Sequence, residues 1–266
     1  MVDLYTKLYL GLPKIELGIG DFLMKEIEKY VSTPPPLKST EEAPDSFLTV
    51  DGVIRLANVK RKEFGLPSLV VSAKLSASAK LKVEDMFNNQ YFSHDSPSDI
   101  AIGDLAASVG YEFIAIGENL ALGNFKNDEA LVNAWMNSSG HRENILNPKY
   151  KEIGVAVARG TFEGKTTWLA VQHFGTPLAV CSAPDEQIKT EIESDKEKLR
   201  EIEDKLTNLL DEFGNMKKRD PEYNQKIEEY NNLVSEYNAT IGEIKTSIDK
   251  YNIQVNKYNT CVTTNQ

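Results

Sequence analysis

The most informative stretch of the sequence is Trp135-Met-Asn-Ser-Ser-Gly-His-Arg-Glu-Asn-Ile-Leu146. It begins inside a pattern of apolar residues that predicts a helix over residues 128–136, with Asn127 or Asp128 as the N-cap. Beyond this helix the chain becomes polar, and His141 lies in the polar part. Imidazole is a frequent metal ligand and acid–base group, so the stretch is a candidate part of a functional site.

The surrounding sequence predicts a mixed domain. Residues 51–64 and 75–87 show helical apolar spacing, and Gly65-Leu66-Pro67 ends the first of these helices. Residues 153–158 and 166–174 have the composition of strands. Since the helices precede the strands instead of alternating with them, we expect an α+β fold built in layers.

The C-terminal third has a different pattern. From Ile188 to Phe213 and again from Tyr223 to Tyr258, apolar or aromatic residues recur mostly at steps of three and four, as at the a and d positions of a coiled coil. Residues 214–219 are typical of a turn between the two runs, and Asp220-Pro221 is typical of a helix start. The sequence therefore predicts a long antiparallel α-helical (coiled-coil) hairpin.

The two cysteines of the chain test this hairpin. Pairing residues across a turn between Phe213 and Tyr223 brings Cys181 to within a turn of Cys261. We therefore predict a Cys181–Cys261 disulfide that closes the open end of the hairpin, and with it an oxidising compartment. The alternative is a pair of free buried thiols.

The first 45 residues form a separate segment. Apolar residues recur at helical spacing from Ile15 to Val31, which predicts a short amphipathic helix that packs on the main domain. The stretch from Thr33 to Pro44 is polar and rich in proline, as in a polyproline spacer. The expected organisation is an N-terminal helix and linker (1–45), a mixed domain (46–178) and the hairpin (179–266).

Composition and charge narrow the possible functions. The chain has 266 residues, enough for one or two domains, and its formal net charge of −10 argues against nucleic acid as a partner. No apolar run approaches the ~20 residues of a membrane span. Charged residues within the first twenty, such as Asp3 and Lys7, interrupt any signal-peptide core. Either the protein is cytoplasmic, or the sequence begins after a removed export signal.

Two further polar residues are candidates for the same site as His141. His94 lies on an expected loop after the helix at 75–87, and Glu118 follows an apolar stretch. Together the three supply two imidazoles and one carboxylate, which are common ligands of zinc and similar divalent cations. Water or substrate in a fourth position could supply a nucleophile. The three residues are far apart in sequence, so spacing alone leaves their convergence open.

Five short motifs follow one another along the chain: Tyr91–His94, Gly117–Leu120, Trp135–Leu146, Ile153–Val157 and Val171–Gly175. Together they resemble the bacterial branch of the CAP superfamily, which comprises cysteine-rich secretory, antigen 5 and pathogenesis-related proteins and whose domain is also called SCP. The resemblance covers about residues 50–177. It extends neither to the hairpin nor to the first 45 residues.

The resemblance implies an α–β–α sandwich with a shallow cleft, in which two histidines and two glutamates can hold a divalent metal. His94, Glu118 and His141 match three of these four residues, and Ser138 stands at the fourth position. Loss of that carboxylate implies weaker binding of zinc or magnesium and low occupancy, unless water, Asn144 or His173 replaces it.

Two amides complete the candidate cleft. Asn119 and Asn144 are expected either to orient Glu118 and His141 or to satisfy backbone groups of turns. His173 lies on an expected strand. It is as consistent with a hydrogen-bonded core or edge histidine as with a ligand. The predicted cleft set is His94, Glu118, Asn119, Ser138, His141 and Asn144.

Three functions remain open. The first is an extracytoplasmic binding module whose cleft takes a divalent cation, a small ligand or a lipid-like ligand, and the resemblance favours it because members of the family are mostly secreted binding or signalling proteins. The second is a metal-dependent hydrolase or peptidase with Glu118 as general base. The third is a structural surface protein that acts through the hairpin, for which a surplus apolar stripe would be needed to recruit a protein partner.

Overall fold

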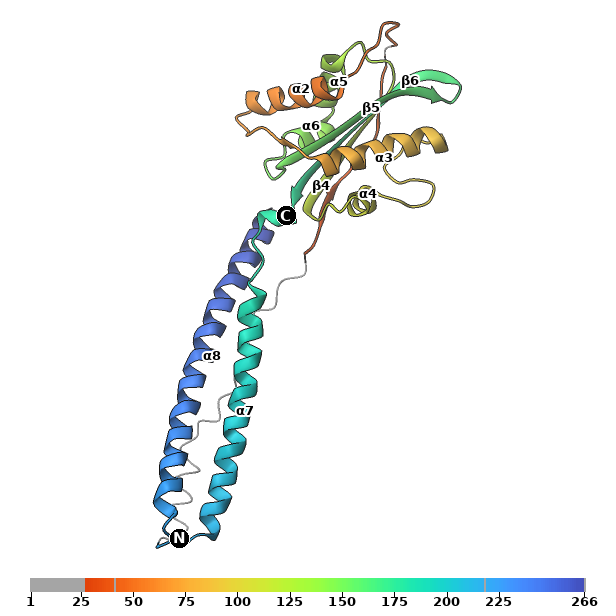
Figure 1. The fold of residues 1–266 in the computed structure, drawn as a ribbon. Coiled ribbons are helices and arrows are strands. Elements are labelled where there is room, and N and C mark those ends of the chain that lie inside the picture. Colours follow the sequence, from red (N-terminus) through yellow and green to blue (C-terminus); the bar gives the residue numbers. More distant parts are fainter. Residues whose placement is uncertain (1–26, 41, 218, 266) are drawn as a thin grey trace. The chain divides into compact units, whose positions relative to one another are not determined.

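The computed structural model describes residues 27–40, 42–217 and 219–265. Within them the chain forms two compact units, one of residues 27–181 with 261–265 and the other of residues 182–260 (Figure 1). Most of the helix expected at residues 15–31 lies outside the described residues. The candidate site belongs to the first unit.

The first unit is built on a six-stranded sheet in the order β1-β4-β6-β5-β3, with β2 also paired to β4. The three long strands are antiparallel neighbours: β4 (Phe113–Leu122) pairs with β6 (Lys165–Pro177), and β6 pairs with β5 (Glu152–Phe162). The short β1 (Tyr30–Ser32) and β2 (Leu37–Lys38) run parallel to β4, and β3 (Val70–Val71) runs parallel to β5. The two expected strands are parts of β5 and β6.

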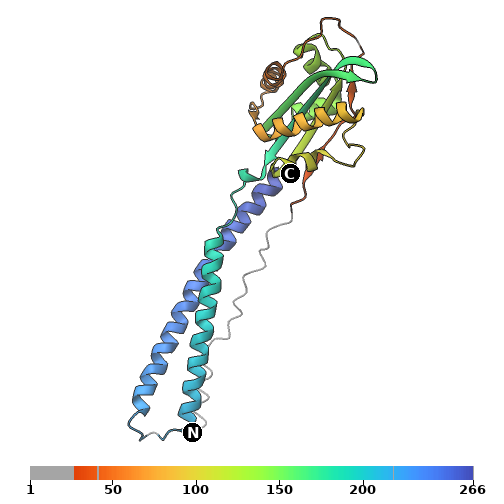
Figure 2. The ribbon, with the colours of Figure 1, turned by 45° about the vertical axis from the view of Figure 1, so that its right-hand side comes forward.

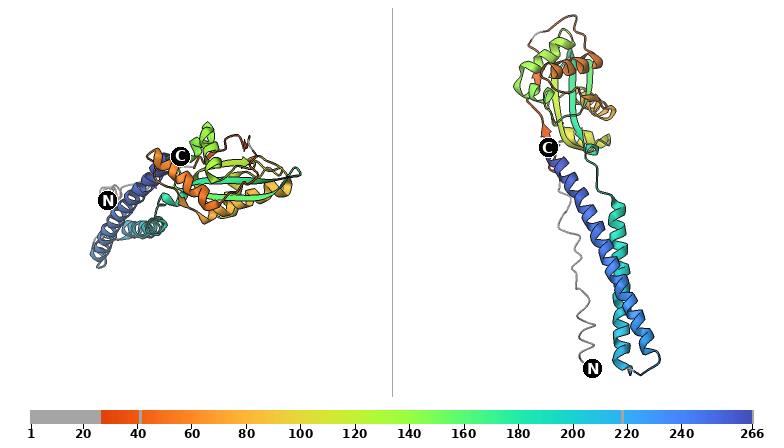
Figure 3. Two further views of the ribbon diagram at one scale, coloured as in Figure 1. Left: turned by 90° about the horizontal axis from the view of Figure 1, so that it is seen from above. Right: turned by 90° about the vertical axis from the view of Figure 1, so that its left-hand side faces the viewer.

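Helices cover both faces of this sheet (Figures 1 and 3). On one face, α2 (Val50–Glu63), α5 (Asp128–Asn137) and α6 (Ser139–Ile145) pack around the buried Trp135. On the other face lie α3 (Ala73–Asn89) and α4 (Ile102–Ser108). The three expected helices are confirmed as α2, α3 and α5, and the layers form the α–β–α sandwich that the resemblance implies.

Side-chain caps fix where α2 and α5 begin. Asn127 accepts a hydrogen bond from the backbone N–H of Ala130 at 2.9 Å, so it is the N-cap of α5 that the sequence suggested. Thr49 caps α2, and the Asp128 carboxylate accepts bonds from both the N–H and the hydroxyl of Thr49, each at 2.7 Å. These bonds tie the start of α2 to the start of α5.

Close packing of α3 against β5 depends on Gly154. A Cβ atom at this position would lie 2.1 Å from the backbone carbonyl carbon of Leu75, so a side chain would push α3 away from the sheet. Gly154 is paired in register with His173 on β6. The approach of α3 to the sheet therefore occurs at the level of the candidate site.

Strand β4 was not expected, although it contains Glu118. All ten of its residues are buried, so the alternation of polar and apolar residues that marks a half-exposed strand is missing. The sequence assigned no element to this segment, because Glu118 and Asn119 interrupt its apolar run. In the structure this polar pair is inside the sheet.

The N-terminal segment also differs from the expectation. Residues 27–29 are irregular, and Tyr30 and Val31, expected in a helix, belong to β1 beside β4. Residues 33–38 were expected in a spacer, but β2 pairs with β4. Because strand pairing with β4 overrides a short helical pattern, residues 30–32 and 37–38 belong to the sheet.

The second unit contains two long helices, α7 (Glu186–Asn215) and α8 (Tyr223–Asn265), which lie side by side (Figures 1 and 2). They share one hydrophobic cluster that includes Ile192 and Ile244. The Tyr237 hydroxyl on α8 donates a hydrogen bond to Glu203 on α7 at 2.8 Å. A coiled-coil geometry of this pair stays a prediction.

The predicted Cys181–Cys261 disulfide is confirmed, so both cysteines of the chain are paired. Cys181 follows the single 3-10 turn η1 (Leu178–Val180), and Cys261 lies in the last turns of α8. None of the helices in the described ranges combines the length and apolar character needed to cross a lipid bilayer.

Candidate functional site

Glu118 is the centre of the candidate site. It lies in the middle of β4, is fully buried, and is paired in register with His173 on β6. One carboxylate oxygen, Oε1, lies 2.6 Å from Nδ1 of His94, and the other, Oε2, lies 2.8 Å from Nε2 of His173. Both oxygens of Glu118 therefore accept a hydrogen bond from a histidine.

His94 projects from the loop after α3, as the sequence predicted, and its side chain is 13% exposed. The buried Lys82 on α3 fixes this loop by donating a hydrogen bond to the backbone carbonyl of His94. The second ring nitrogen of His94, Nε2, lies 2.5 Å from the backbone carbonyl oxygen of Pro34. Both ring nitrogens of His94 therefore face oxygen acceptors.

His173 is the second partner of Glu118, a role the sequence analysis did not assign to it. Its ring is fully buried, and Nδ1 lies 3.0 Å from the hydroxyl oxygen of Ser78 on α3. The missed signal is register: had β4 been recognised, its pairing with the strand at 166–174 would have placed Glu118 beside His173. His173 is therefore a core histidine with both nitrogens hydrogen-bonded, and it orients Glu118.

His141 lies in α6 and is 1% exposed. Its Nδ1 is 2.8 Å from the hydroxyl of Ser138, whereas its Nε2 is buried with no hydrogen-bond partner among the described residues. Burial, and then the positive charge of His94 nearby, lower the pKa of His141 to about 4. At neutral pH this ring is uncharged and has one unused nitrogen.

The two amides act on the backbone of the site. Asn119 donates to the carbonyl of His141 and to the side-chain oxygen of Gln172, both at 3.1 Å. Asn144 donates to the Asn119 side-chain oxygen at 3.0 Å and to the carbonyl of Glu118 at 3.3 Å. They position α6 against β4 through the backbone, and neither is hydrogen-bonded to the Glu118 carboxylate or the His141 ring.

The electrostatics of Glu118 reflect its two histidine partners. Burial alone would raise the pKa of Glu118, but hydrogen bonds from His173 and His94, with the positive charge of Lys82 nearby, lower it to about 2. The carboxylate is therefore ionised at all ordinary pH values. A carboxylate with so low a pKa and both oxygens engaged is a weak general base.

In this arrangement the site does not fit a divalent cation. Both oxygens of Glu118 and both nitrogens of His94 and His173 are engaged in hydrogen bonds, which leaves only Nε2 of His141. No group of three His, Cys, Asp or Glu side chains in the described ranges is arranged to hold a metal ion. Zinc prefers four ligands at about 2.0–2.3 Å, so these histidines would have to rearrange to bind it.

The site is also covered, whereas the sequence analysis expected a cleft open to solvent. Residues 33–36 lie between β1 and β2, and both of these strands pair with β4. Residues 33–36 therefore run along the part of β4 that includes Glu118. Pro34 is buried against Gly140, where an added Cβ atom would come within 2.7 Å of the proline Cβ. The candidate residues His94, Glu118, Ser138 and His141 do come together, but beneath this segment.

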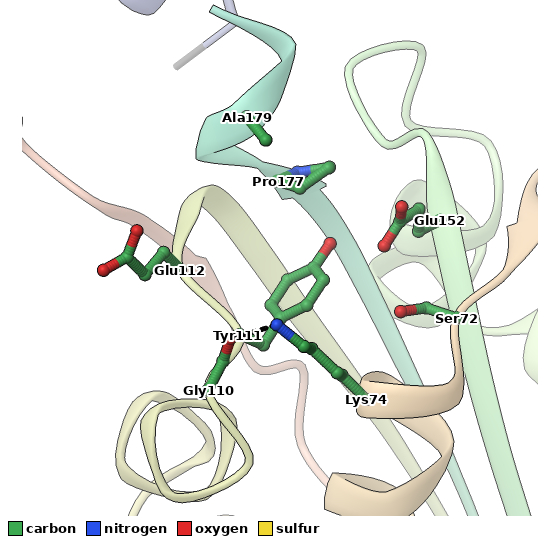
Figure 4. Close-up of a pocket in the computed structure, with 8 residues that line it drawn as sticks. All are labelled: Ser72, Lys74, Gly110, Tyr111, Glu112, Glu152, Pro177 and Ala179. Atoms are coloured by element: carbon green, nitrogen blue, oxygen red, sulfur yellow. Dashed lines mark hydrogen bonds between the residues drawn. The ribbon is translucent and has the colours of Figure 1, made fainter. Parts of the chain in front are cut away.

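A separate pocket of about 310 Å³ lies in the first unit at another position. Lys74 spans part of it and donates to the carbonyl of Gly110 at 2.6 Å. The ring of Tyr111 lies between Lys74 and Pro177, and Glu152 lies on the side toward which the Tyr111 hydroxyl points (Figure 4). None of the predicted site residues lines this pocket.

Comparisons with known proteins identify similar sequences for the central part of the chain. Residues 54–174 match the family model described as CAP, the cysteine-rich secretory protein family. The chain is 39% identical over 141 residues to the uncharacterized protein YkwD of Bacillus subtilis (strain 168), which covers 53% of this chain and 53% of that protein. It is 36% identical over 107 residues to the uncharacterized membrane protein YlbC of the same strain, covering 40% of this chain and 31% of that protein.

A solved structure also matches in part. It is the crystal structure of an extracellular protein containing an SCP domain from Bacillus anthracis str. Ames, with 31% sequence identity and a TM-score of 0.42, covering 47% of this chain and 39% of that chain. The chain thus spans about half the length of one B. subtilis relative and about a third of the other.

The sandwich and its histidine–glutamate cluster therefore define a CAP domain, and the family match places it at residues 54–174. Residues 54–174 of this chain are thus similar to the CAP domains of bacterial proteins.

Proposed function

We propose that the CAP domain of this protein is an extracytoplasmic binding module whose ligand site centres on His94, Glu118 and His141. The observation that supports it most is Nε2 of His141, a buried nitrogen with no hydrogen-bond partner among the described residues. Leaving such a group unpaired costs about 1–3 kcal/mol. A ligand that pairs with it recovers this free energy on binding.

The charges of the site favour binding over hydrolysis. Glu118 is committed to two histidines and has a pKa of about 2, so it is unsuited to accept a proton from water at neutral pH. The neutral His141 ring, with one unpaired nitrogen, instead offers a fixed polar contact for recognition. The hydrolase alternative thus loses Glu118 as its general base.

Binding of zinc or magnesium stays a prediction drawn from the family. Because His141 has the only unengaged nitrogen, we expect weak binding and low occupancy in the conformation described. A small or lipid-like ligand does not require Glu118 to give up its histidine partners. Binding of such a ligand is therefore the better supported part of the proposal.

Two features outside the site support an extracytoplasmic location and a spacer role for the helices. A structural disulfide persists in oxidising compartments, so Cys181–Cys261 favours export. We propose that α7 and α8 form an antiparallel coiled-coil hairpin, with apolar side chains used in their own pairing. Ile253, at 55%, is the one large apolar side chain of the described part of these helices that is well exposed, so they present no surplus stripe for a partner.

The proposed function is tested by native mass spectrometry of the full chain after incubation with a cell-envelope extract or with zinc chloride. The wild type is compared with His141→Ala and with Ser139→Ala, a change at an exposed neighbour. We expect an added mass from the extract on the wild type and on Ser139→Ala that is lost in His141→Ala. No added mass on any form, or the same added mass on His141→Ala, would refute the proposal.

A further inference from the structure

Residues 30–38, named here the strap, cover the site. Their two ends pair with β4 as parallel strands, with Ser32 opposite Gly117 and Leu37 opposite Ala121. Between these pairs the three consecutive prolines of the strap pass Glu118, Asn119 and Leu120. Proline has no N–H, so this part of the strap brings no backbone donor that could be left unpaired above the buried site.

Pro34 makes the closest contacts of the strap with the site. It is buried, whereas its neighbours Thr33 and Pro35 are exposed. Its carbonyl oxygen accepts the hydrogen bond from Nε2 of the His94 ring, and its own ring lies against Gly140, the residue before His141. Gly140 has no side chain, and this provides the room for the proline ring.

Backbone atoms make the polar contacts that fix the strap. Asn144 donates to the carbonyl of Ser32 at 3.3 Å, and the N–H of Ser39, just beyond the strap, donates to the carbonyl of Leu122 at 2.9 Å. The side chains of Tyr30 and Val31 are 42% and 48% exposed. The strap is thus held through its extended backbone, its seated proline and Leu37, which packs against the hydrophobic cluster around Trp135.

We infer that the site binds an extended, proline-containing peptide added as a parallel strand to β4, and that the strap occupies this position within the same chain. This inference rests on the proposed function for the location of the site and names the class of ligand. Binding by strand addition takes its affinity from main-chain hydrogen bonds and its specificity from a few pockets, which here are the His94–Gly140 seat for proline and the edge of β4. The strap pairs through only three and two residues, so a second peptide can compete for the same edge.

Competition with the strap sets the expected affinities. A tethered segment acts at an effective concentration of about 1 mM. A free peptide whose own dissociation constant is about 100 μM is then weakened roughly tenfold in the wild-type chain. Displacing the strap should reveal the intrinsic affinity.

The test uses the full chain and a fluorescently labelled peptide with the sequence of residues 28–40. Pro34→Lys places an ammonium group in the buried seat beside the His94 ring and should release the strap, because burying an unpaired charge is costly. Pro35→Lys makes the same change at the exposed neighbour and is the matched control. We expect Pro34→Lys to bind the labelled peptide at least tenfold more tightly than the wild type, Pro35→Lys to match the wild type, and a peptide with lysine in place of Pro34 not to bind.

A folded Pro34→Lys chain that binds the peptide no better than the wild type would overturn the inference, and so would equal binding of the lysine-containing peptide. If Pro34→Lys does not fold, a protease site inserted in the exposed turn between Pro44 and Asp45 allows the folded chain to be cut. Excess labelled peptide should then replace the released strap, and a cut chain that takes up no peptide refutes the inference.

The mass-spectrometric test of His141 separates this inference from the proposed function. If the chain binds a ligand in a His141-dependent manner but does not bind the peptide, only the peptide inference is contradicted. A chain that binds the peptide but shows no loss in His141→Ala contradicts only the role given to His141.

Discussion

At the residue scale, Glu118 links the elements of the site more directly than any other described side chain of the cluster. It joins β4 to the loop after α3 through His94 and to β6 through His173. Because this carboxylate is buried and charge-assisted, its hydrogen bonds contribute more than those of an exposed ion pair.

Replacing Glu118 with glutamine should therefore destabilise the CAP domain by about 2–4 kcal/mol, because one ring N–H would face an amide donor instead of an oxygen. Both tryptophans of the chain, Trp135 and Trp168, lie in this domain, so fluorescence-detected urea unfolding reports it selectively. Glu63→Gln removes an exposed carboxylate paired with Lys60 and should change the free energy of unfolding by less than about 0.5 kcal/mol. Equal effects of the two substitutions would contradict this role of Glu118.

The lowered pKa of His141 makes stability depend on pH. The ring takes up a proton near pH 6.5 in the unfolded chain and only near pH 4 in the folded domain, so the free energy of unfolding should fall as the pH is lowered through this range. The expected loss is about 1–3 kcal/mol. His141→Asn cannot titrate and should flatten the pH profile between 6.5 and 4, whereas a slope equal to that of the wild type would argue against a buried neutral His141.

Residues of the site that lie in sequence motifs could be predicted, whereas residues placed by strand register could not. His94, Glu118 and His141 were found from the motifs that contain them, and the structure brings their segments together. His173 and Ser78 were missed as partners because their contacts follow from the pairing of β4 with β6 and from the approach of α3 at Gly154. The cover by Pro34 has no local signal, since it arises from a parallel strand pairing between segments about 85 residues apart.

At the scale of elements, the sequence predicted the amphipathic helices, but it did not predict the strands that are fully buried or very short. Helices α2, α3 and α5 each have one apolar face on the sheet, so their periodicity is visible in sequence. Strand β4 is buried on both faces and shows no alternation, while β1 and β2 are too short for a pattern. The helical spacing that ended at Val31 was overridden by pairing with β4.

The pairing of α7 with α8 can be tested with two isoleucines of the same helix. Ile244 is fully buried in the cluster shared by the helices, whereas Ile253 is exposed. Ile244→Ala should lower the stability of the helix pair by about 2–4 kcal/mol, measured by thermal loss of helical circular dichroism, because it leaves a cavity. Ile253→Ala should stay within about 0.5 kcal/mol of the wild type. Equal sensitivity at both positions would argue against a shared core.

At the scale of the whole molecule, the disulfide is the main covalent constraint. It joins residues separated by 80 positions, and its pairing followed from the heptad pattern and from the reach of the few residues between Cys181 and α7. This long-range prediction succeeded because long helices have a regular rise, which fixes distances that irregular segments do not.

Reduction of the disulfide should destabilise the chain by about 3–5 kcal/mol, because the unfolded state gains a long unconstrained loop. The measurement is the midpoint of helical unfolding with and without a thiol reductant. A double variant, Cys181→Ser with Cys261→Ser, should already show the low midpoint and should not respond to reductant. If the wild type does not respond either, the disulfide does not stabilise the chain as described.

The most direct test of the site as a whole is the protonation pattern of its three histidines, measured at pH 6 by long-range proton–nitrogen NMR on ¹⁵N-histidine-labelled chain, with His141→Asn used for assignment. We predict three distinct states: His94 hydrogen-bonded through both nitrogens, His173 with Nε2 hydrogen-bonded to Glu118, and His141 neutral with Nε2 unbonded. Three similar spectra typical of solvent-exposed imidazole would contradict the buried cluster beneath the strap.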